Sequence, residues 1–460
     1  MKTSRIQILL LAAFTLLAPW AAPAAATNSL VWRADSDQIS ADIRDEALWP
    51  LLEDIAHQTG WHIFVEPGAS HDASVKFQNL PAGVALRKLL GNLNYAMVPQ
   101  TNGPQELYVF KTTMRAATQR VAAVKAQLLP MRHVANQLLI KLKHGANIDL
   151  IAKERGAKVV GRNDKLGIYL LEFADAAATD AALAGLKASP DVESVDYNYI
   201  YDAPVTPQPL SSVPPGVKPP TLTADANNSS DPCEPTIGLI DTGVQSLGSK
   251  LDAFVSTRTN VTGVATTLSS STITHGTAMA ETILNAIQQQ NSSSSVRIYS
   301  VDVYGNSETT TTWNVALGVQ SAVDAGASVL NLSLAGTTDS AILDDIIQQA
   351  LAKGVVIFAA AGNQPVSTDT YPAAISGVNA VTALSAPGQL ASYANYGSFV
   401  DLALPGASVV YLGDQAYVVQ GTSSSTAYAS GIAAGTKSVN CLSWPDIESA
   451  MLKKFTVPSN

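Results

Sequence analysis

The sequence predicts an α/β protein: a doubly wound parallel sheet in the C-terminal half, preceded by two small α+β domains. The N-terminal and C-terminal halves of the chain differ in net charge. Of the 460 residues, residues 231–460 carry seven basic and sixteen acidic side chains, which accounts for the whole net charge of −9. Apolar strand patterns that end at polar residues, together with helical patterns, are typical of an α/β fold. Hydrophobic residues make up 47% of the chain and charged residues 14%, so a folded protein is expected.

The first 26 residues are typical of a secretory signal peptide. Lys2 and Arg5 precede an apolar run over residues 6–17, and small residues at 24–26 resemble a cleavage site. The apolar run is shorter than the roughly 20 residues that span a bilayer, which disfavours the alternative of an N-terminal membrane anchor. We expect export to a bacterial periplasm or to the exterior, with no membrane span in the mature chain.

Residues 38–112 are predicted to form the first α+β domain, in the order strand, helix, strand, strand, helix, strand. Leu48, Leu51 and Ile55 follow helical spacing, and Gly60 ends that helix. The segments ADIRDEALWPLLEDIAHQTGWHIFVEPG and ASVKFQNLPAGVALRKLLGNLNYAMV resemble the short N-terminal domain of secretins and TonB-dependent receptors, which usually mediates contacts. The resemblance implies an envelope or secretion-system partner. The alternative is a stable small domain without a partner.

Residues 134–202 are predicted to repeat this order of strands and helices as a second α+β domain. Its closing segment, ASPDVESVDYNYIYDAP, resembles the end of a subtilisin propeptide. In that family the propeptide packs on the enzyme, helps it to fold and leaves its tail in the active site. The resemblance therefore implies a zymogen, and a plain linker domain is the alternative.

Residues 203–232 are predicted to be a proline-rich linker. Eight of the 24 prolines lie between residues 202 and 232, together with runs of Ser and Asn. Such a chain is extended and exposed, and exposed chain is where proteases cut. We therefore expect the protein to be processed between about Asp202 and Pro232.

Three short blocks in residues 233–460 carry the candidate chemistry. An apolar strand ends at Asp241, His275 begins one helix, and Ser423 opens another among small residues. A serine nucleophile needs a base, and the base needs an orienting carboxylate. A Ser at a helix N-terminus also lies beside unpaired N–H groups that favour a nearby oxyanion. Taken singly, the three residues have ordinary alternatives: a turn Asp, a capping or surface His and an N-cap Ser.

The motifs LIDTG, HGT and GTSSSTAYASG strongly resemble the three catalytic blocks of subtilisin-like serine proteases, in the subtilisin order. The resemblance extends over nearly all of residues 235–449 and implies the subtilisin-like fold, with Asp241, His275 and Ser423 as the triad. The segment GVVIFAAAGN resembles the family strand whose Asn, here Asn363, completes the oxyanion hole. The expected substrate-binding residues are Ser333, Leu334, Ala335, Gly336, Ala360, Ala361 and Gly362.

Several positions depart from the family pattern. Ala278 stands where the family often has a second His, and Glu281 where it usually has Gly. We expect Glu281 on a solvated helix face; the alternatives are that it lines the cleft or shifts the pKa of His275. Ala427 and Ser424 replace the usual Pro and a common Met near the nucleophile. We expect these changes to affect specificity and rate rather than the type of reaction.

Cys233 and Cys441 are the only cysteines. An exported chain meets oxidising conditions, so we expect a disulfide between them, and two buried thiols are the alternative. Neither cysteine lies in a C-x-x-C pair or near clustered His, and no EF-hand loop is present. We therefore expect no metal site and no cofactor, with a structural calcium ion on scattered ligands as the alternative.

Together these patterns predict an exported serine endopeptidase that is made as a zymogen and works through an acyl-enzyme. Its expected partners are peptide or protein substrates and its own propeptide. No strongly basic region exists, which argues against nucleic acid as a main partner. The alternative is a catalytically silent or propeptide-locked module that binds an envelope or secretion component. Short apolar side chains in the expected pocket favour apolar or aromatic residues before the cut.

Overall fold

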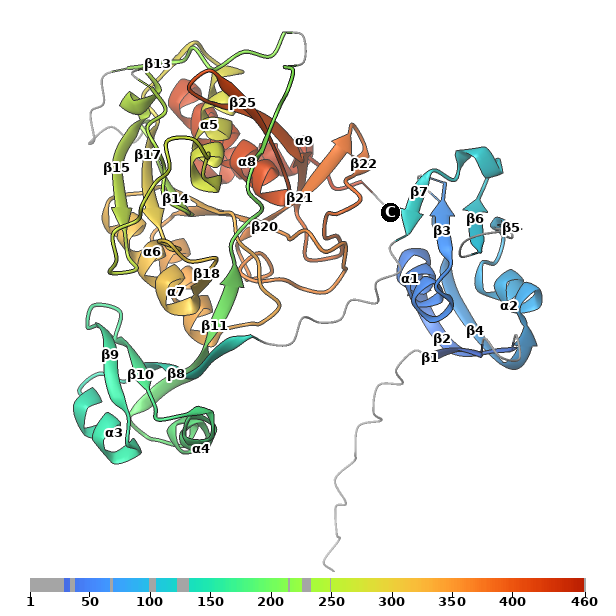
Figure 1. The fold of residues 1–460 in the computed structure, drawn as a ribbon, viewed down its shortest axis with the longest axis horizontal. Helices are drawn as coiled ribbons and strands as arrows, with labels where there is room; N and C mark the ends of the chain where they lie inside the picture. The colour runs from blue at the N-terminus through green and yellow to red at the C-terminus, as the bar shows by residue number, and fades with distance from the viewer. Residues whose placement is uncertain are drawn as a thin grey trace, which may run out of the picture.

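The chain forms three units that follow one another in sequence (Figure 1). The computed structural model describes residues 29–33, 38–66, 69–98, 105–121, 132–213, 216–225, 233–248 and 250–458. The predicted signal peptide, residues 1–26, lies outside these ranges. Within them, no helix is both long and apolar enough to cross a membrane.

The first unit packs two helices, α1 (Leu48–Thr59) and α2 (Ala82–Leu89), against two small sheets with strand orders β1-β2-β4 and β5-β6-β3-β7. Its strands are β1 (Ser29–Arg33), β2 (Gln38–Ala47), β3 (His62–Val65), β4 (Asp72–Pro81), β5 (Asn94–Val98), β6 (Glu106–Phe110) and β7 (Gln119–Val121), and a short 3₁₀ turn, η1, covers Met114–Ala116. Leu51 and Ile55 are fully buried on the inner face of α1, as their spacing predicts.

This first unit extends beyond the predicted range 38–112 at both ends. Strand β1 pairs antiparallel with β2, and β7 pairs antiparallel with β3. Both are short segments of five and three residues, which carry too little periodicity to be recognised, and β7 also pairs with a strand more than 50 residues earlier. The predicted order of strands and helices also lacks β5, which joins β6 as an antiparallel pair.

The second unit has the order of elements that the sequence predicts for residues 134–202. Two helices, α3 (Ile148–Arg155) and α4 (Ala176–Lys187), cover one sheet of order β18-β11-β8-β10-β9. Four of its strands are β8 (His133–Leu142), β9 (Lys158–Asn163), β10 (Ile168–Glu172) and β11 (Val192–Asp202). The fifth, β18 (Thr309–Thr311), comes from the third unit, so β11 joins the two units through backbone hydrogen bonds.

The third unit is an α/β fold around one large sheet of order β15-β17-β14-β19-β20-β21-β22, with β23 also paired to β21. The strands are β14 (Thr236–Asp241), β15 (Val255–Asn260), β17 (Arg297–Asp302), β19 (Val329–Leu332), β20 (Val356–Ala360), β21 (Asn379–Ala386), β22 (Gln389–Leu390) and β23 (Leu402–Pro405). All pairs in this sheet are parallel except β21 with β22. The strand order reverses around β14, where catalytic groups are expected in a parallel α/β sheet.

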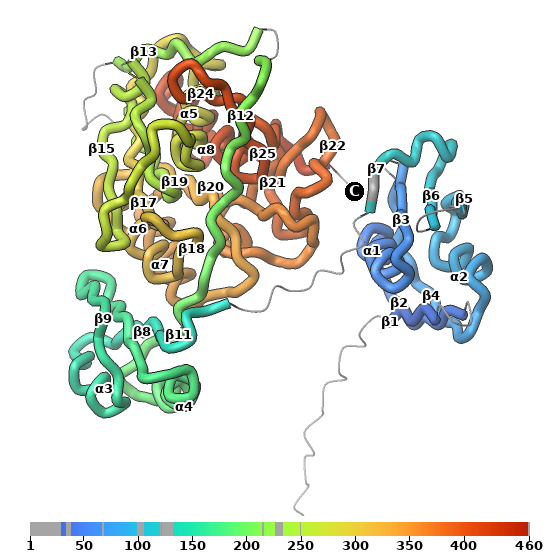
Figure 2. Tube along the Cα trace, viewed as in Figure 1, coloured from blue at the N-terminus to red at the C-terminus, as the bar shows by residue number. Residues whose placement is uncertain are grey.

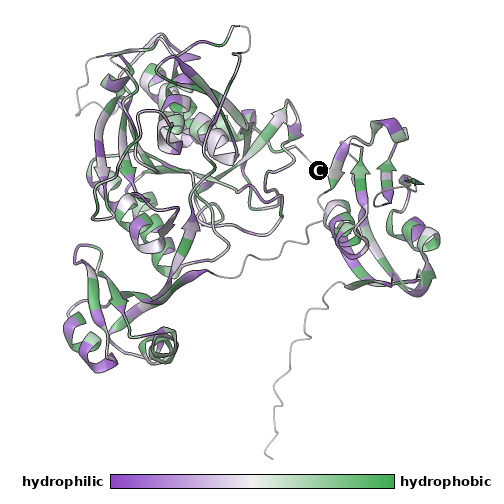
Figure 3. Cartoon of the chain, in the orientation of Figure 1, coloured by the Kyte–Doolittle hydropathy of each residue, from purple (hydrophilic) through white to green (hydrophobic). Residues whose placement is uncertain are grey.

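Helices flank this sheet on both faces, which gives two apolar cores, one on each side. The helices are α5 (His275–Gln288), α6 (Thr312–Asp324), α7 (Ala341–Ala352), α8 (Thr422–Asn440) and α9 (Trp444–Lys454), with a 3₁₀ turn, η2, at Leu251–Phe254. Met279 and Ile283 of α5 belong to one core, and Val315 and Val319 of α6 belong to the other. Figure 3 shows the corresponding alternation of apolar and polar bands along the elements.

The predicted linker is not a free connection. Residues 203–213 and 216–225, together called the strap, run along the surface of the third unit (Figure 2). Strand β12 (Gln208–Pro209) pairs with β25 (Gln415–Gln420), which also pairs with β24 (Ala407–Leu412), and β13 (Thr223–Ala224) pairs with β16 (Ser293–Ser294). Leu222 is fully buried in the core of the third unit. Most of the described residues of this segment are exposed, as the sequence predicts, but strand pairing and the buried Leu222 side chain fix it to the third unit.

Candidate active site

Asp241 is the last residue of β14, a strand with neighbours on both sides in the sheet. Five of the six residues of β14 are buried, and Asp241 itself is 1% exposed. Its Oδ1 accepts a hydrogen bond from the backbone N–H of Thr242 at 2.7 Å. A carboxylate buried in this way needs a further donor, and the N-terminus of α5 brings one to it.

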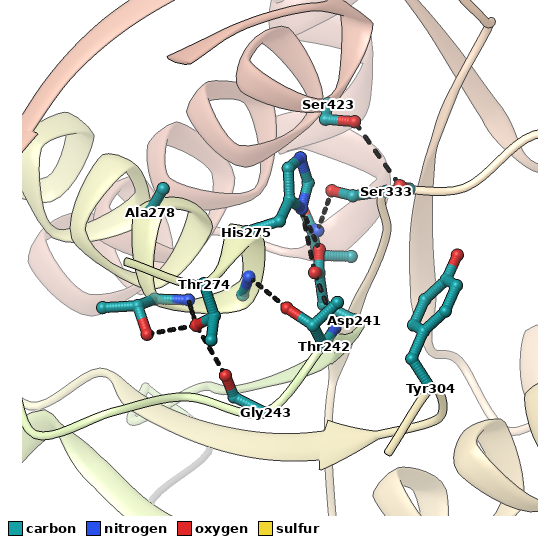
Figure 4. A network of polar contacts seen from close by, with 12 residues as sticks. Asp241, Thr242, Gly243, Thr274, His275, Ala278, Tyr304, Ser333 and Ser423 are labelled. Carbon is teal, nitrogen blue, oxygen red and sulfur yellow. Dashed lines mark hydrogen bonds and ion pairs between the residues drawn. The ribbon is translucent and has the colours of Figure 1, made fainter. Parts of the chain in front are cut away.

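His275 is the first residue of α5, and its ring faces Asp241 (Figure 4). The distances from His275 Nδ1 to Asp241 Oδ1 and Oδ2 are 2.9 and 3.0 Å. Gly276 permits this close approach, because a Cβ at position 276 would lie 2.1 Å from the carbonyl oxygen of Thr242. Thr274 is the N-cap of the helix, accepting from the Thr277 N–H. The backbone therefore fixes the imidazole against the carboxylate.

Ser423 is the second residue of α8, so its backbone N–H has no acceptor within the helix. The N-cap is Gly421, whose φ of 148° is strained for other residues. Ser423 Oγ donates to the carbonyl oxygen of Ser333 at 3.4 Å, and within the described residues no hydrogen bond joins it to His275. Such bonds are often long before substrate binds. Figure 4 shows the His275 ring between Asp241 and Ser423, with the Ser423 hydroxyl directed toward Ser333.

Asn363 follows β20 and lies close to the start of α8. Its Oδ1 accepts from both the N–H and the Oγ1–H of Thr422, at 2.8 and 3.0 Å. These two bonds identify the amide oxygen and turn the Nδ2 donor away from Thr422. A donor held in this way, beside the N–H of Ser423, can stabilise an anionic oxygen next to Ser423 Oγ.

The tail of the second unit lies at the cleft in which substrate is expected to bind. A cavity of about 270 Å³ is lined by residues 199–205 together with Ser423 and Asn363. The same cavity is lined by six of the seven expected substrate-binding residues, namely Ser333, Leu334, Ala335, Gly336, Ala360 and Gly362. The seventh, Ala361, does not line it. Ala361 is fully buried. Its carbonyl oxygen accepts a hydrogen bond from Thr370 Oγ1 at 2.5 Å, so this carbonyl faces the protein interior rather than the cavity.

The tail lies in the cleft as an extended strand. The N–H of Ala203 donates to the carbonyl of Glu308 at 2.8 Å, continuing the antiparallel pairing of β11 with β18. Tyr201 is 2% exposed and lies against Gly336, where a Cβ would be 2.8 Å from its ring. Tyr304, whose pKa is raised well above its ordinary value by burial and by the Asp241 carboxylate, donates to the carbonyl of Asp202 at 3.2 Å.

Glu281 differs from the expectation of a solvated helix face. It is 1% exposed, because strand β24 covers this side of α5. Burial raises the pKa of Glu281 to about 7, although its Oε2 accepts from the N–H of Tyr411 at 2.9 Å. Glu281 does not line the cleft cavity.

Two contributors to the site were missed at the sequence level. Thr422 orients Asn363, and its place beside Ser423 in the GTS motif was a usable signal. Asn395 accepts from the N–H of Gln364 at 2.8 Å, and its own N–H donates to the Gly362 carbonyl at 2.9 Å. Asn395 therefore holds the turn that carries Asn363, from the loop that follows β22.

Cys233 and Cys441 form a disulfide, with their Cα atoms 4.9 Å apart. It joins the segment before β14 to the end of α8, as the sequence predicts. Within the described ranges, no group of three or more His, Cys, Asp or Glu side chains is arranged to hold a metal ion.

Two family models match the chain. The model of the subtilase family matches residues 234–458, which contain Asp241, His275 and Ser423 in the geometry described above. The C-terminal half of the chain belongs to the subtilase family. The model of the fervidolysin N-terminal prodomain matches residues 119–198, so the subtilase domain is preceded by a prodomain, as its closing segment predicts.

Several curated proteins match part of the chain. The "Thermostable alkaline protease" of Halalkalibacterium halodurans is 34% identical over 169 residues, which cover 36% of this chain and 47% of that protein. "Subtilisin Savinase" of Lederbergia lenta is 34% identical over 179 residues, covering 38% of this chain and 66% of that protein. A "Thermophilic serine proteinase" of a Bacillus species is 29% identical over 320 residues, covering 66% of this chain and 78% of that protein. The chain thus spans about half the length of the alkaline protease.

Solved structures support the fold of the prodomain and subtilase domain. Fervidolysin from Fervidobacterium pennivorans has a TM-score of 0.52 at 17% identity, covering 69% of this chain and 57% of that chain. The epidermin leader peptide processing serine protease of Staphylococcus aureus has a TM-score of 0.50 at 15% identity, covering 68% and 92%. At these identities the likeness concerns the fold alone.

Proposed function

We propose that this chain is a serine endopeptidase made as a self-inhibited precursor. The observation that carries the proposal is the meeting of three groups at one edge of the sheet: the buried pair Asp241–His275, Ser423 at a helix N-terminus, and Asn363 held by Thr422. The names of the subtilase relatives, all proteases, support the same reaction type.

In the proposed reaction, Ser423 Oγ attacks the carbonyl carbon of a peptide bond while His275 Nε2 takes its proton. The carboxylate of Asp241 holds Nδ1–H and stabilises the imidazolium that forms. The Asn363 amide and the Ser423 N–H donate to the oxyanion. His275 then protonates the leaving amine, and water hydrolyses the acyl-enzyme by the same steps in reverse order. The reaction needs no cofactor, and we propose none.

The intact chain corresponds to the inhibited state in this proposal. Residues 199–205 line the same cavity as the nucleophile, so a substrate chain has to displace them. Activation requires a cut in this segment and release of the prodomain. In this proposal, the propeptide-locked module that the sequence left as an alternative is the same protein before the cut.

A fluorophosphonate probe tests the proposal. Processed protein should be labelled on Ser423 and lose peptide hydrolysis, while Ser423→Ala should take no label. The intact precursor should label much more slowly, because its cleft is filled. If processed protein takes no label, or if Ser423→Ala is labelled as well as wild type, the chain is not a serine protease of this kind.

We propose that residues 1–26 direct export and that the enzyme acts in a bacterial periplasm or outside the cell. The support is the charge and apolar pattern of that segment together with the disulfide, which suits an oxidising compartment. The first unit is proposed to bind an envelope or secretion-system protein. A pull-down with Ser423→Ala that recovers no envelope protein would argue against this partner.

A further inference from the structure

Glu281 is a buried carboxyl group that the proposed reaction does not use. It lies on α5, the helix that begins with His275, and is 1% exposed. Its Oε2 accepts from the N–H of Tyr411, while its Oε1 has no hydrogen-bond partner within the described residues. A buried carboxyl oxygen without a partner is costly, so its presence calls for a physical explanation.

The residue bound by Glu281 belongs to the hairpin that leads into the nucleophile. Tyr411 lies on β24 and pairs with Ala416 of β25, and β25 ends at Gln420, three residues before Ser423. The two ends of the hairpin also meet, because the N–H of Gly421 donates to the carbonyl of Gly406 at 2.9 Å. A shift of this hairpin against α5 would therefore move Ser423 relative to His275.

We propose that Glu281 is a positioning residue, which ties the β24–β25 hairpin to α5 and so sets the separation between Ser423 and His275. The proposal rests on the proposed protease activity for its kinetic consequence. Within the described residues, the other hydrogen bond between α5 and the hairpin is weak, since Asn285 Nδ2 lies 3.5 Å from the Val409 carbonyl. Glu281 thus supplies the stronger hydrogen bond between the helix and the hairpin.

Burial favours the protonated form of Glu281 in this packed arrangement, and it outweighs the hydrogen bond from the Tyr411 N–H, which favours the carboxylate. The charged and titratable groups of the elements packed on α5 are His275 of α5 itself, Asp241 of β14, Arg297, Tyr299 and Asp302 of β17, Tyr411 of β24, and Tyr428 and Lys437 of α8. Within the described residues only Tyr411 interacts with the carboxyl group, by its backbone and its phenol. In the part of the chain that the structure describes, no cation interacts with the Glu281 carboxyl group. Ionisation therefore favours entry of water or a shift of the hairpin.

Kinetics of processed enzyme test the positioning role. Glu281→Ala should lower kcat by about 10- to 100-fold, with the KM of a short peptide within about twofold, because misplacement acts on the chemical step. Glu281→Gln keeps an acceptor for Tyr411 and cannot ionise. The kcat of Glu281→Gln should equal that of wild type at pH 6. It should be higher than that of wild type at pH 8.5, where the wild-type kcat declines. Asn285→Ala, the matched control on the same face, should change kcat less than about twofold.

Hydrogen exchange separates this proposal from the proposed function. In full-length Ser423→Ala, the protection factor of the Tyr411 N–H should fall as pH rises through about 7. Adding Glu281→Gln should remove that fall, and Glu53→Gln, at a distant carboxyl, should not. If protection follows this pattern while wild type hydrolyses nothing, only the protease function fails. If Tyr411 protection and the pH profile of kcat are the same in wild type and Glu281→Gln, the positioning role is wrong.

Discussion

At the residue scale, Asn363 shows how the fold prepares a donor before substrate arrives. Thr422 binds its amide oxygen twice, so the Nδ2 group is oriented by the same helix start that carries Ser423. We predict that Asn363→Ala lowers kcat by about 10²- to 10³-fold with little change in KM, because the lost bond forms chiefly in the transition state. Steady-state assays of processed enzyme check this. A loss confined to KM would show that Asn363 only binds substrate.

Glu281 also carries a prediction about stability. Its pKa is about 7 in the folded chain and 4.5 ordinarily, so folding favours the protonated form. The contribution of this group to the free energy of unfolding is fully present below pH 4.5 and is lost as pH rises through 7. The loss is roughly 3 kcal/mol for a pKa shift of this size. We predict that Glu281→Gln equals wild type near pH 4.5 and is more stable by about 2–3 kcal/mol at pH 8. Denaturant unfolding at the two pH values measures this, and an equal difference at both would contradict it.

The limits of prediction at this scale follow from physical causes. Asp241, His275, Ser423 and Asn363 were predictable because their chemistry needs fixed residue types in short motifs. The burial of Glu281 was not, since a helix pattern gives the face of a residue but not which distant strand covers it. Only the packing of β24 on α5 decides that point.

At the element scale, the strap between prodomain and subtilase domain decides where processing can occur. Residues 199–205 lie beside Ser423, whereas β12 and β13 are held by strand pairing and Leu222 by the core. We predict that the cut falls within residues 203–207 and that residues 208–225 stay with the mature enzyme. N-terminal sequencing of processed protein checks this. A mature N-terminus beyond residue 225 would contradict it.

The helix start at Gly276 gives a second prediction for an element. A Cβ there would lie 2.1 Å from the Thr242 carbonyl oxygen, which is backbone and cannot turn aside. Gly276→Ala should therefore shift α5, lower stability by about 1–3 kcal/mol and separate His275 from Asp241. Thermal unfolding and kcat measure the two effects. Gly388→Ala, at an open position with positive φ, is a control for stability alone.

The order of elements was well predicted where each helix or strand carries its own periodicity, as in residues 134–202. Strands β1, β7, β12 and β13 were missed, because two to five residues carry too little pattern and depend on partners elsewhere in the chain. The strap illustrates this most clearly. Its prolines predict an extended chain correctly, but whether that chain is free or paired depends on β25 and β16.

At the scale of the whole molecule, the disulfide closes most of the subtilase domain into one loop. Cys233 and Cys441 are 208 residues apart, so the bond restricts a large part of the unfolded chain. We predict that Cys233→Ser with Cys441→Ser lowers the free energy of unfolding by about 2–5 kcal/mol. Denaturant unfolding of the oxidised protein and of the double variant measures this. Two freely alkylated thiols in native wild type would contradict the prediction.

Among the described residues, the contacts between the first unit and the subtilase domain include a cluster formed by Trp49, Glu53 and Tyr396. The rings of Trp49 and Tyr396 meet edge to face at 6.4 Å, and Glu53 Oε1 accepts from the Tyr396 hydroxyl at 3.0 Å and from Trp49 Nε1 at 3.1 Å. Burial raises the pKa of Glu53 to about 7, against the opposing effect of these two donors. Tyr396 is next to Asn395, which braces the turn of Asn363, so this contact lies close to the catalytic machinery.

We predict that this contact depends on pH. The docked form favours protonated Glu53, so docking should be complete below pH 4.5 and weaken as pH rises through about 7. Full-length Ser423→Ala should therefore have a larger radius of gyration at pH 8.5 than at pH 5.5, measured by small-angle X-ray scattering. Glu53→Gln should stay docked at both, since its amide cannot ionise, while Tyr396→Phe, which loses the hydroxyl donor, should loosen at both. Equal dimensions of the parent protein at the two pH values would show that apolar contacts alone hold the first unit in place.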